Sequence, residues 1–221
     1  MPRPAAAPLR ETDPGATPTA ILDAAERLFA EAGFHGATTR AIAGAAGANP
    51  ALIHYHFGSK EALFEAAFAR RSDAINGERR DRLAGLEARG AATLEAVLTA
   101  LLEPTIALGR DPTRGGAHYA RLLAHVAAGT DARSRRLTAA RYDAIARLYI
   151  AAIGRAVPGL APADAVRGYL HAISIGMALM APTGRERALS DGAIGEEPVA
   201  ALVARAVRFA AAGIRALAAP D

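Results

Sequence analysis

The stretch TTRAIAGAAGANPALIHYHFGSKEAL (residues 38–63) holds the start and stop signals of two short helices. Thr38 can cap the start of the first helix, and Gly47 suits the left-handed residue that ends it. Asn49 followed by Pro50 repeats the start signal directly afterwards. Two short helices joined by a tight turn predict a helix-turn-helix.

The second helix of this pair is expected to present an unusual surface. Ile53 and Phe57 are four residues apart and share one face, so we expect them to be buried. Their burial turns Leu52, Tyr55 and His56 outward. An apolar side chain and two rings outside so short a helix predict a binding partner. The simpler interpretation is that these rings are solvated or pack on a neighbouring helix.

The sequence predicts no metal site and no cofactor. His54 and His56 are two residues apart, which separates them by about 200° around a helix and keeps them from sharing one ion. There is no cysteine, no Gly-x-Ser-x-Gly elbow and no Gly-x-x-x-x-Gly-Lys loop. We therefore expect no enzymatic activity, although a helical enzyme with a triad of scattered His, Ser and Asp stays an alternative.

The composition favours a helical protein. Of 221 residues, 52% are apolar and only 5% aromatic, so a core must come largely from Ala, Leu, Ile and Val. The lack of cysteine fits a reducing compartment, and we expect a cytoplasmic location. The sequence has no run of about eighteen apolar residues, so we expect no membrane-spanning segment. Residues 1–16 lack the apolar region of a signal peptide and are expected to form a disordered tail.

Apolar periodicity and helix-capping signals predict nine helices and no strand. They cover residues 18–33, 39–47, 50–58, 59–89, 93–108, 117–128, 131–157, 163–181 and 199–218. Pro104 is expected to kink the fifth helix, and residues 182–198 are predicted to be a loop. The predicted fold class is all-α, with a three-helix domain over residues 17–62 and a larger helical domain over residues 63–221.

The net charge of +4 is compatible with nucleic acid binding and does not establish it. Residues 17–61 carry a net charge of −1. This charge comes from Arg27, Arg40 and Lys60 against Asp23, Glu26, Glu31 and Glu61.

Residues 17–64 resemble the DNA-binding domain of the TetR family of bacterial transcriptional regulators. The similarity runs through ILDAAERLFAEAGFHGATTRAIAGAAGANPALIHYHFGSKEALF. It comprises an apolar first helix, Gly-Phe before the Thr-Thr cap, and a recognition helix that ends in aromatic-His-Phe-x-Ser-Lys-Glu. The helical remainder is similar to the ligand-binding and dimerisation domain of that family. The resemblance implies a regulator, expected to be a repressor, that binds double-stranded DNA as a homodimer.

The resemblance also implies which residues contact DNA. Those expected to approach base edges are Asn49, Pro50, Ala51 and Leu52; His54, Tyr55 and His56 reach bases or phosphates; Thr39, Arg40 and Lys60 hold the phosphate backbone. The low charge of this domain predicts few phosphate contacts and weak binding by one copy. A homodimer that pairs through its last two helices and reads an inverted repeat is therefore expected.

The second domain is expected to hold a small apolar effector in a cavity with a few polar groups. The candidate lining residues are His118, Tyr119, Leu122, His125, Tyr142, Tyr149, His171, Ser174, Met177 and Met180. The segments AVPGLAPADAVRGYL, TGRERALSDG and VRFAAAGIRAL resemble the fatty-acid-responsive branch of the family, which implies a fatty acid or acyl thioester. A helical protein-binding adaptor without DNA binding is the alternative, and it leaves the outward face of the third helix unexplained.

Overall fold

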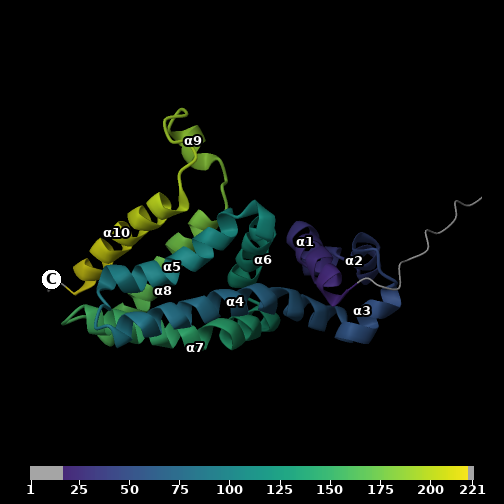
Figure 1. Cartoon of the computed structure of the whole chain (residues 1–221), viewed down its shortest axis with the longest axis horizontal. Helices are drawn as coiled ribbons and strands as arrows, with labels where there is room; N and C mark the ends of the chain where they lie inside the picture. The colour runs from purple at the N-terminus through teal and green to yellow at the C-terminus, as the bar shows by residue number, and fades with distance from the viewer. Residues whose placement is uncertain (1–16, 219–221) are drawn as a thin grey trace, which may run out of the picture. The chain divides into compact units, whose positions relative to one another are not determined.

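The computed structural model describes residues 17–218, so the predicted tail of residues 1–16 lies outside the described residues. This part of the chain consists of helices and connections without any strand, which confirms the all-α prediction (Figure 1). The elements are α1 (Pro18–Gly36), α2 (Thr39–Ala46), α3 (Pro50–Phe57), α4 (Lys60–Ala88), α5 (Leu94–Arg110), the 3-10 helix η1 (Pro112–Arg114), α6 (Gly116–Ala128), α7 (Ala132–Ala156), α8 (Pro162–Met180), α9 (Arg185–Leu189) and α10 (Val199–Leu217).

The prediction of nine helices is wrong, because residues 17–218 hold ten α-helices. The additional one is α9, within the segment that was predicted to be a loop. It has only five residues, and its N-cap residue is Gly184, which has no side chain to cap the helix and is left-handed with φ 71°. A helix of little more than one turn has no apolar repeat for sequence reasoning to detect.

The chain forms two compact units that divide between Ala67 and Phe68, within α4. The sequence places the domain boundary slightly earlier, after residue 62. Helix α4 runs without interruption through Gly77 and Gly85, two positions that weaken a helix, and supplies residues to both units.

The first unit packs around an aromatic cluster. Phe29 on α1 is completely buried, and its ring meets Phe64 edge-on at a centroid distance of 5.0 Å. Ile42 on α2 and Ile53 on α3 are buried in the same unit. Gly33, with φ 68° and ψ 176°, breaks the helical path of α1 where the sequence predicts the helix to stop. Complete burial of one side chain of this size contributes roughly 1.5–3 kcal/mol to the stability of the folded state.

The core of the second unit lies around α5, which packs against α8 and α10 (Figure 1). Leu98, Leu101 and Ile106 of this helix are completely buried. The helix continues through Pro104 to Arg110, although proline removes one backbone donor from the helical ladder. Over residues 17–218, no helix combines the length and the apolar character needed to cross a membrane.

Candidate DNA-binding helix and effector cavity

Side-chain caps build the helix-turn-helix from both sides of its turn. The Thr38 hydroxyl accepts a hydrogen bond from Ala41 N at 3.1 Å, and Asn49 Oδ1 accepts one from Ala51 N at 2.9 Å. Between them, Gly47 adopts the left-handed conformation with φ 66° and ψ 21°. These caps satisfy backbone donors that helices as short as α2 and α3 leave free. The turn predicted from the sequence is therefore present with its expected chemistry.

Helix α3 buries Ile53, whereas Phe57, which was also expected to be buried, is half-buried at the end of the helix. Ile53 is 2% exposed, whereas Tyr55 is 79% exposed and has the His56 ring edge-on beside it at 5.0 Å. His54 is also exposed, and Leu52 is half-buried rather than fully outward. The described surface of α3 thus offers two imidazoles and a phenol to a partner.

The other residues that the resemblance assigns to DNA lie on or next to this motif. Pro50 and Ala51 are exposed at the start of α3, and Arg40 is exposed at the start of α2, beside the half-buried Thr39. Lys60, at the start of α4, holds its Nζ 4.7 Å from the centre of the Phe34 ring. Asn49 uses Oδ1 for capping, which leaves its amide N–H groups as its donors towards a base. Their contacts with DNA remain predictions.

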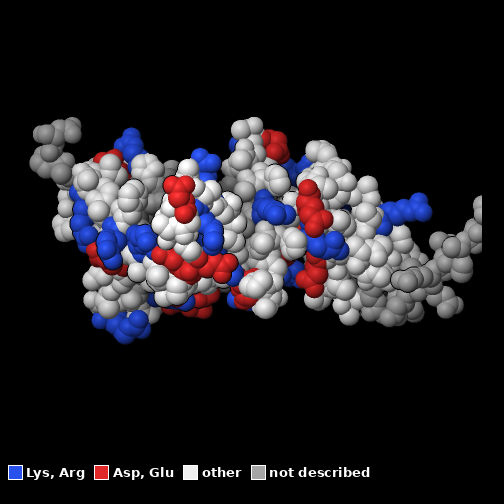
Figure 2. Space-filling view, turned by 90° about the horizontal axis from the view of Figure 1, so that it is seen from above, with Lys and Arg blue, Asp and Glu red and all other residues white. Residues whose placement is uncertain are grey.

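The charge of the first unit is unevenly placed. Residues 39–60 contain Arg40 and Lys60 and no acidic side chain, whereas Asp23, Glu26 and Glu31 lie on α1. The N-termini of α2 and α3 add partial positive charge to this acid-free segment. Figure 2 shows acidic and basic side chains mixed over the face that it draws, with much uncharged surface between them.

A mostly apolar cavity of about 220 Å³ lies among helices of the second unit. Its lining residues come from five helices, α4 to α8: Ile75, Arg79, Thr105, Leu123, Ala127, Thr138, Tyr142, Tyr169, Leu170, Ile173, Ser174 and Met177. Tyr142, Ser174 and Met177 belong to the predicted set. Arg79, Thr105, Thr138 and Tyr169 are polar lining residues that the sequence prediction missed.

The structure places the other candidates away from the cavity lining. Tyr119 lies behind it, with its hydroxyl 2.7 Å from that of Tyr142. The Tyr149 hydroxyl donates to the Arg79 carbonyl at 2.9 Å inside the core. The remaining five also lie elsewhere: Leu122 and Met180 are buried, His118 is half-buried, His125 is exposed, and His171 borders a separate hollow between α8 and α10.

Burial governs the ionisation of the groups around this cavity. It raises the pKa of the Tyr142, Tyr149 and Tyr169 hydroxyls, so all three stay neutral. Burial also lowers the pKa of the Arg79 guanidinium, which starts from a value high enough to keep it charged. The cavity wall therefore carries one buried cation among neutral hydroxyls.

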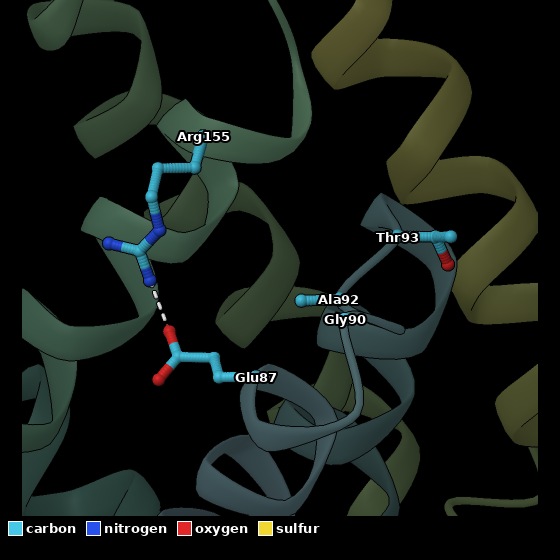
Figure 3. A pocket seen from close by; sticks show the side chains of 5 residues that line it. All are labelled: Glu87, Gly90, Ala92, Thr93 and Arg155. Atoms are coloured by element: carbon cyan, nitrogen blue, oxygen red, sulfur yellow. Dashed lines mark hydrogen bonds and ion pairs between the residues drawn. The ribbon is translucent and has the colours of Figure 1, made fainter.

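A second, wider hollow lies at the surface near the end of α4 (Figure 3). It is lined by Glu87, Gly90, Ala92, Thr93 and Arg155. Figure 3 shows the Arg155 guanidinium of α7 reaching the Glu87 carboxylate of α4 across it, as an ion pair. The hollow is open, and its two charged groups neutralise each other, so the mostly apolar cavity among α4 to α8 is the better candidate for a ligand. Over residues 17–218, no group of His, Asp and Glu is arranged to hold a metal ion.

A capped helix-turn-helix joined to a helical unit with an internal apolar cavity defines the class of helix-turn-helix regulators. Residues 21–67 match the family described as bacterial regulatory proteins, tetR family, and residues 99–213 match the tetracyclin repressor-like C-terminal domain. The chain belongs to the TetR family of transcriptional regulators.

Curated relatives share parts of the sequence. The transcriptional repressor KstR2 of Rhodococcus jostii is 41% identical over 86 residues, which are 38% of this chain and 41% of the relative. The transcriptional repressor AcnR of Corynebacterium efficiens is 50% identical over 46 residues, which are 21% of this chain and 24% of the relative. The chain thus spans less than half the length of these curated relatives.

Solved structures share the whole fold at low sequence identity. The fatty acid degradation regulator FadR from Bacillus halodurans superimposes with a TM-score of 0.66 at 18% identity, over 90% of this chain and 96% of that one. AibR, solved in complex with isovaleryl coenzyme A and operator DNA, superimposes with a TM-score of 0.66 at 22% identity. The superposition covers 87% of this chain and 96% of AibR. These similarities establish the two-part helical fold.

Proposed function

We propose that the chain is a ligand-responsive repressor that binds an inverted-repeat operator as a homodimer and is released by a small apolar effector. The observation that carries this proposal is the exposed face of α3, where Tyr55 is 79% exposed and His54 and His56 are exposed beside it. The caps at Thr38 and Asn49 and the turn at Gly47 hold this helix in place, so its exposed side chains are presented together to a partner.

The chemistry of this face suits the major groove. Imidazole and phenol groups donate hydrogen bonds to phosphates and base edges, and Leu52 offers an apolar contact for a thymine methyl group. The acid-free segment 39–60 keeps negative charge away from the phosphates. Its two cations, Arg40 and Lys60, are few for a DNA-binding unit, so one copy would bind weakly and two copies are needed for useful affinity.

The surface of α8 and α10 supports the pairing of two copies. Phe209 is 74% exposed, Val166 41%, and Leu170, which also lines the cavity, 52%, so these two helices carry several exposed large apolar side chains. Tyr169 and Ile214 on the same helices are buried and belong to the core of the unit. Ala212, Gly213 and Ala216 are exposed small residues at helical spacing from Phe209, and they permit a second copy to approach closely across a twofold axis.

The cavity in the second unit supports an effector with an apolar portion. Its volume of about 220 Å³ lies below the 300–1,000 Å³ that is usual for ligand sites, which favours a short or medium chain. The names of two structural relatives, a fatty acid degradation regulator and a complex with isovaleryl coenzyme A, point to acyl compounds as the first class to test.

The salt dependence of DNA affinity tests this proposal. Fluorescence anisotropy would compare a duplex from upstream of the protein's own gene with an unrelated duplex of equal length. We expect tighter binding to the upstream duplex and an affinity for both that falls as salt rises, because binding releases counterions. Equal, salt-independent affinities would overturn the proposal and favour the adaptor alternative.

A further inference from the structure

Arg79 is a buried arginine in the wall of the apolar cavity that has no acidic partner. Its side chain is 1% exposed, within the part of α4 that belongs to the second unit. Among residues 17–218, no Asp or Glu carboxylate forms an ion pair with it. Buried charges in proteins are normally paired, since desolvation of an isolated charge is costly.

The hydrogen bonds of Arg79 all go to neutral acceptors. Nε donates to the Leu101 carbonyl at 2.9 Å, Nη1 to Asn76 Oδ1 at 3.1 Å and Nη2 to the Thr105 hydroxyl at 2.6 Å. A guanidinium has five N–H groups, so these three bonds leave two donors for a further acceptor. None of the three acceptors carries a negative charge, so the positive charge of the guanidinium is not compensated.

A structural role explains only part of this arrangement. The bond from Nε to the Leu101 carbonyl joins α4 to α5. A neutral side chain could provide that single donor. Arg79 lines the cavity together with apolar residues, among them Ile75, Leu123 and Ile173, and with the hydroxyl groups of neighbouring Thr, Tyr and Ser residues.

We propose, on the basis of the effector site proposed above, that the effector is a free carboxylate with an apolar chain of short or medium length. Its carboxylate pairs with the Arg79 guanidinium, and the Thr105 and Tyr142 hydroxyls lie in the same cavity wall. Its chain lies along the apolar wall. A carboxylate matches the guanidinium fork and supplies the missing negative charge, whereas a thioester carbonyl is neutral.

The test compares matched ligands on the full chain by isothermal titration. Octanoate and octanamide have nearly the same size and shape and differ in charge. We expect octanoate to bind the wild-type protein at least about tenfold more tightly, because a hydrogen-bonded ion pair replaces a neutral contact. Equal affinities would overturn the proposal, as would tighter binding of octanoyl coenzyme A than of octanoate.

Variants then locate the effect. Arg79→Gln is expected to abolish the preference for octanoate, while the matched control Arg82→Gln, three residues further along α4 and paired with Glu103, keeps it. An unchanged preference in Arg79→Gln would overturn the assignment. If circular dichroism shows that this variant does not fold, the wild-type comparison decides.

DNA affinity separates this proposal from the proposed function. If the chain binds its upstream duplex specifically but shows no preference for octanoate, the carboxylate inference fails and the regulator stands. If octanoate is preferred but no specific duplex is bound, the cavity assignment stands and the proposed function fails.

Discussion

The hydroxyls of Tyr119 and Tyr142 lie 2.7 Å apart and join α6 to α7 behind the cavity. The Phe68 ring of α4 packs on both, with centroid distances of 6.0 Å to Tyr119 and 6.2 Å to Tyr142. Three helices therefore meet at one aromatic cluster, of which Tyr142 also lines the cavity. An effector that moves the Tyr142 ring would act on α6 and on α4 at the same contact.

Tyr142→Phe tests this connection. The substitution removes one hydroxyl of the pair and keeps the ring, so we expect a loss of about 0.5–1.5 kcal/mol in the free energy of unfolding. Urea denaturation followed by circular dichroism measures it. We also expect the variant to require a different effector concentration for release from DNA. A variant that matches the wild type in both measurements would show that the hydroxyl pair is unimportant.

Gly109→Ala tests the contact between α5 and α8. A Cβ atom at this position would lie 2.5 Å from the Met180 carbonyl oxygen, so the two helices would have to separate. We expect a loss of roughly 1–3 kcal/mol in the free energy of unfolding. Gly77→Ala is the matched control, because a Cβ there meets open space within α4, and it should be neutral or stabilising by up to about 1 kcal/mol. Equal effects of the two variants would contradict the packing described.

Phe209→Glu tests the proposed dimer face. Because Phe209 is 74% exposed, a charge there should leave the fold of one copy intact and repel the apolar face of a second. Light scattering coupled to size-exclusion chromatography should show a dimer for the wild type and a monomer for the variant. Leu189→Glu, on α9 and 72% exposed, is the control that should stay dimeric. A dimeric Phe209→Glu variant would place the interface elsewhere.

Asp131 gives a prediction for pH. A hydrogen bond from the Ser134 hydroxyl at 2.6 Å, followed by the backbone N–H groups of Ser134 and Arg133, lowers the pKa of this α7 cap from 3.8 to about 2. Since the folded state has the lower pKa, the contribution to stability is complete above about pH 4 and is lost as the pH falls towards 2. Nuclear magnetic resonance titration of the Asp131 carboxyl carbon measures it. A midpoint near the ordinary value of 3.8 would contradict the cap.

The helix boundaries of the first unit could be predicted from the sequence because local chemistry sets them. Thr38, Gly47 and Asn49 each act within a few residues of their position, and the structure shows the expected bonds and dihedral angles. The outward direction of Tyr55 followed from the burial of Ile53 two positions earlier on a helix.

The cavity lining was harder to predict, because it depends on how each helix is rotated against four others. Tyr142 and Tyr149 are seven residues apart on one face of α7, yet only the first reaches the cavity. Arg79 was overlooked among the arginines of α4. The sequence does indicate its burial, because Arg79 lies four residues after Ile75 and four before Leu83, on an apolar stripe of the helix. A charged residue in such a stripe is the pattern that identifies a buried cation.

An electrophoretic mobility shift tests the central claim most directly. The duplex comes from upstream of the protein's own gene, and wild type is run beside Tyr55→Ala and the matched surface variant Arg147→Ala on α7. We predict a specific shift for the wild type and Arg147→Ala, and its loss in Tyr55→Ala, because Tyr55 lies at the centre of the exposed α3 face. An equal shift for all three proteins, or no shift at low salt for any, would contradict the account that α3 binds the operator.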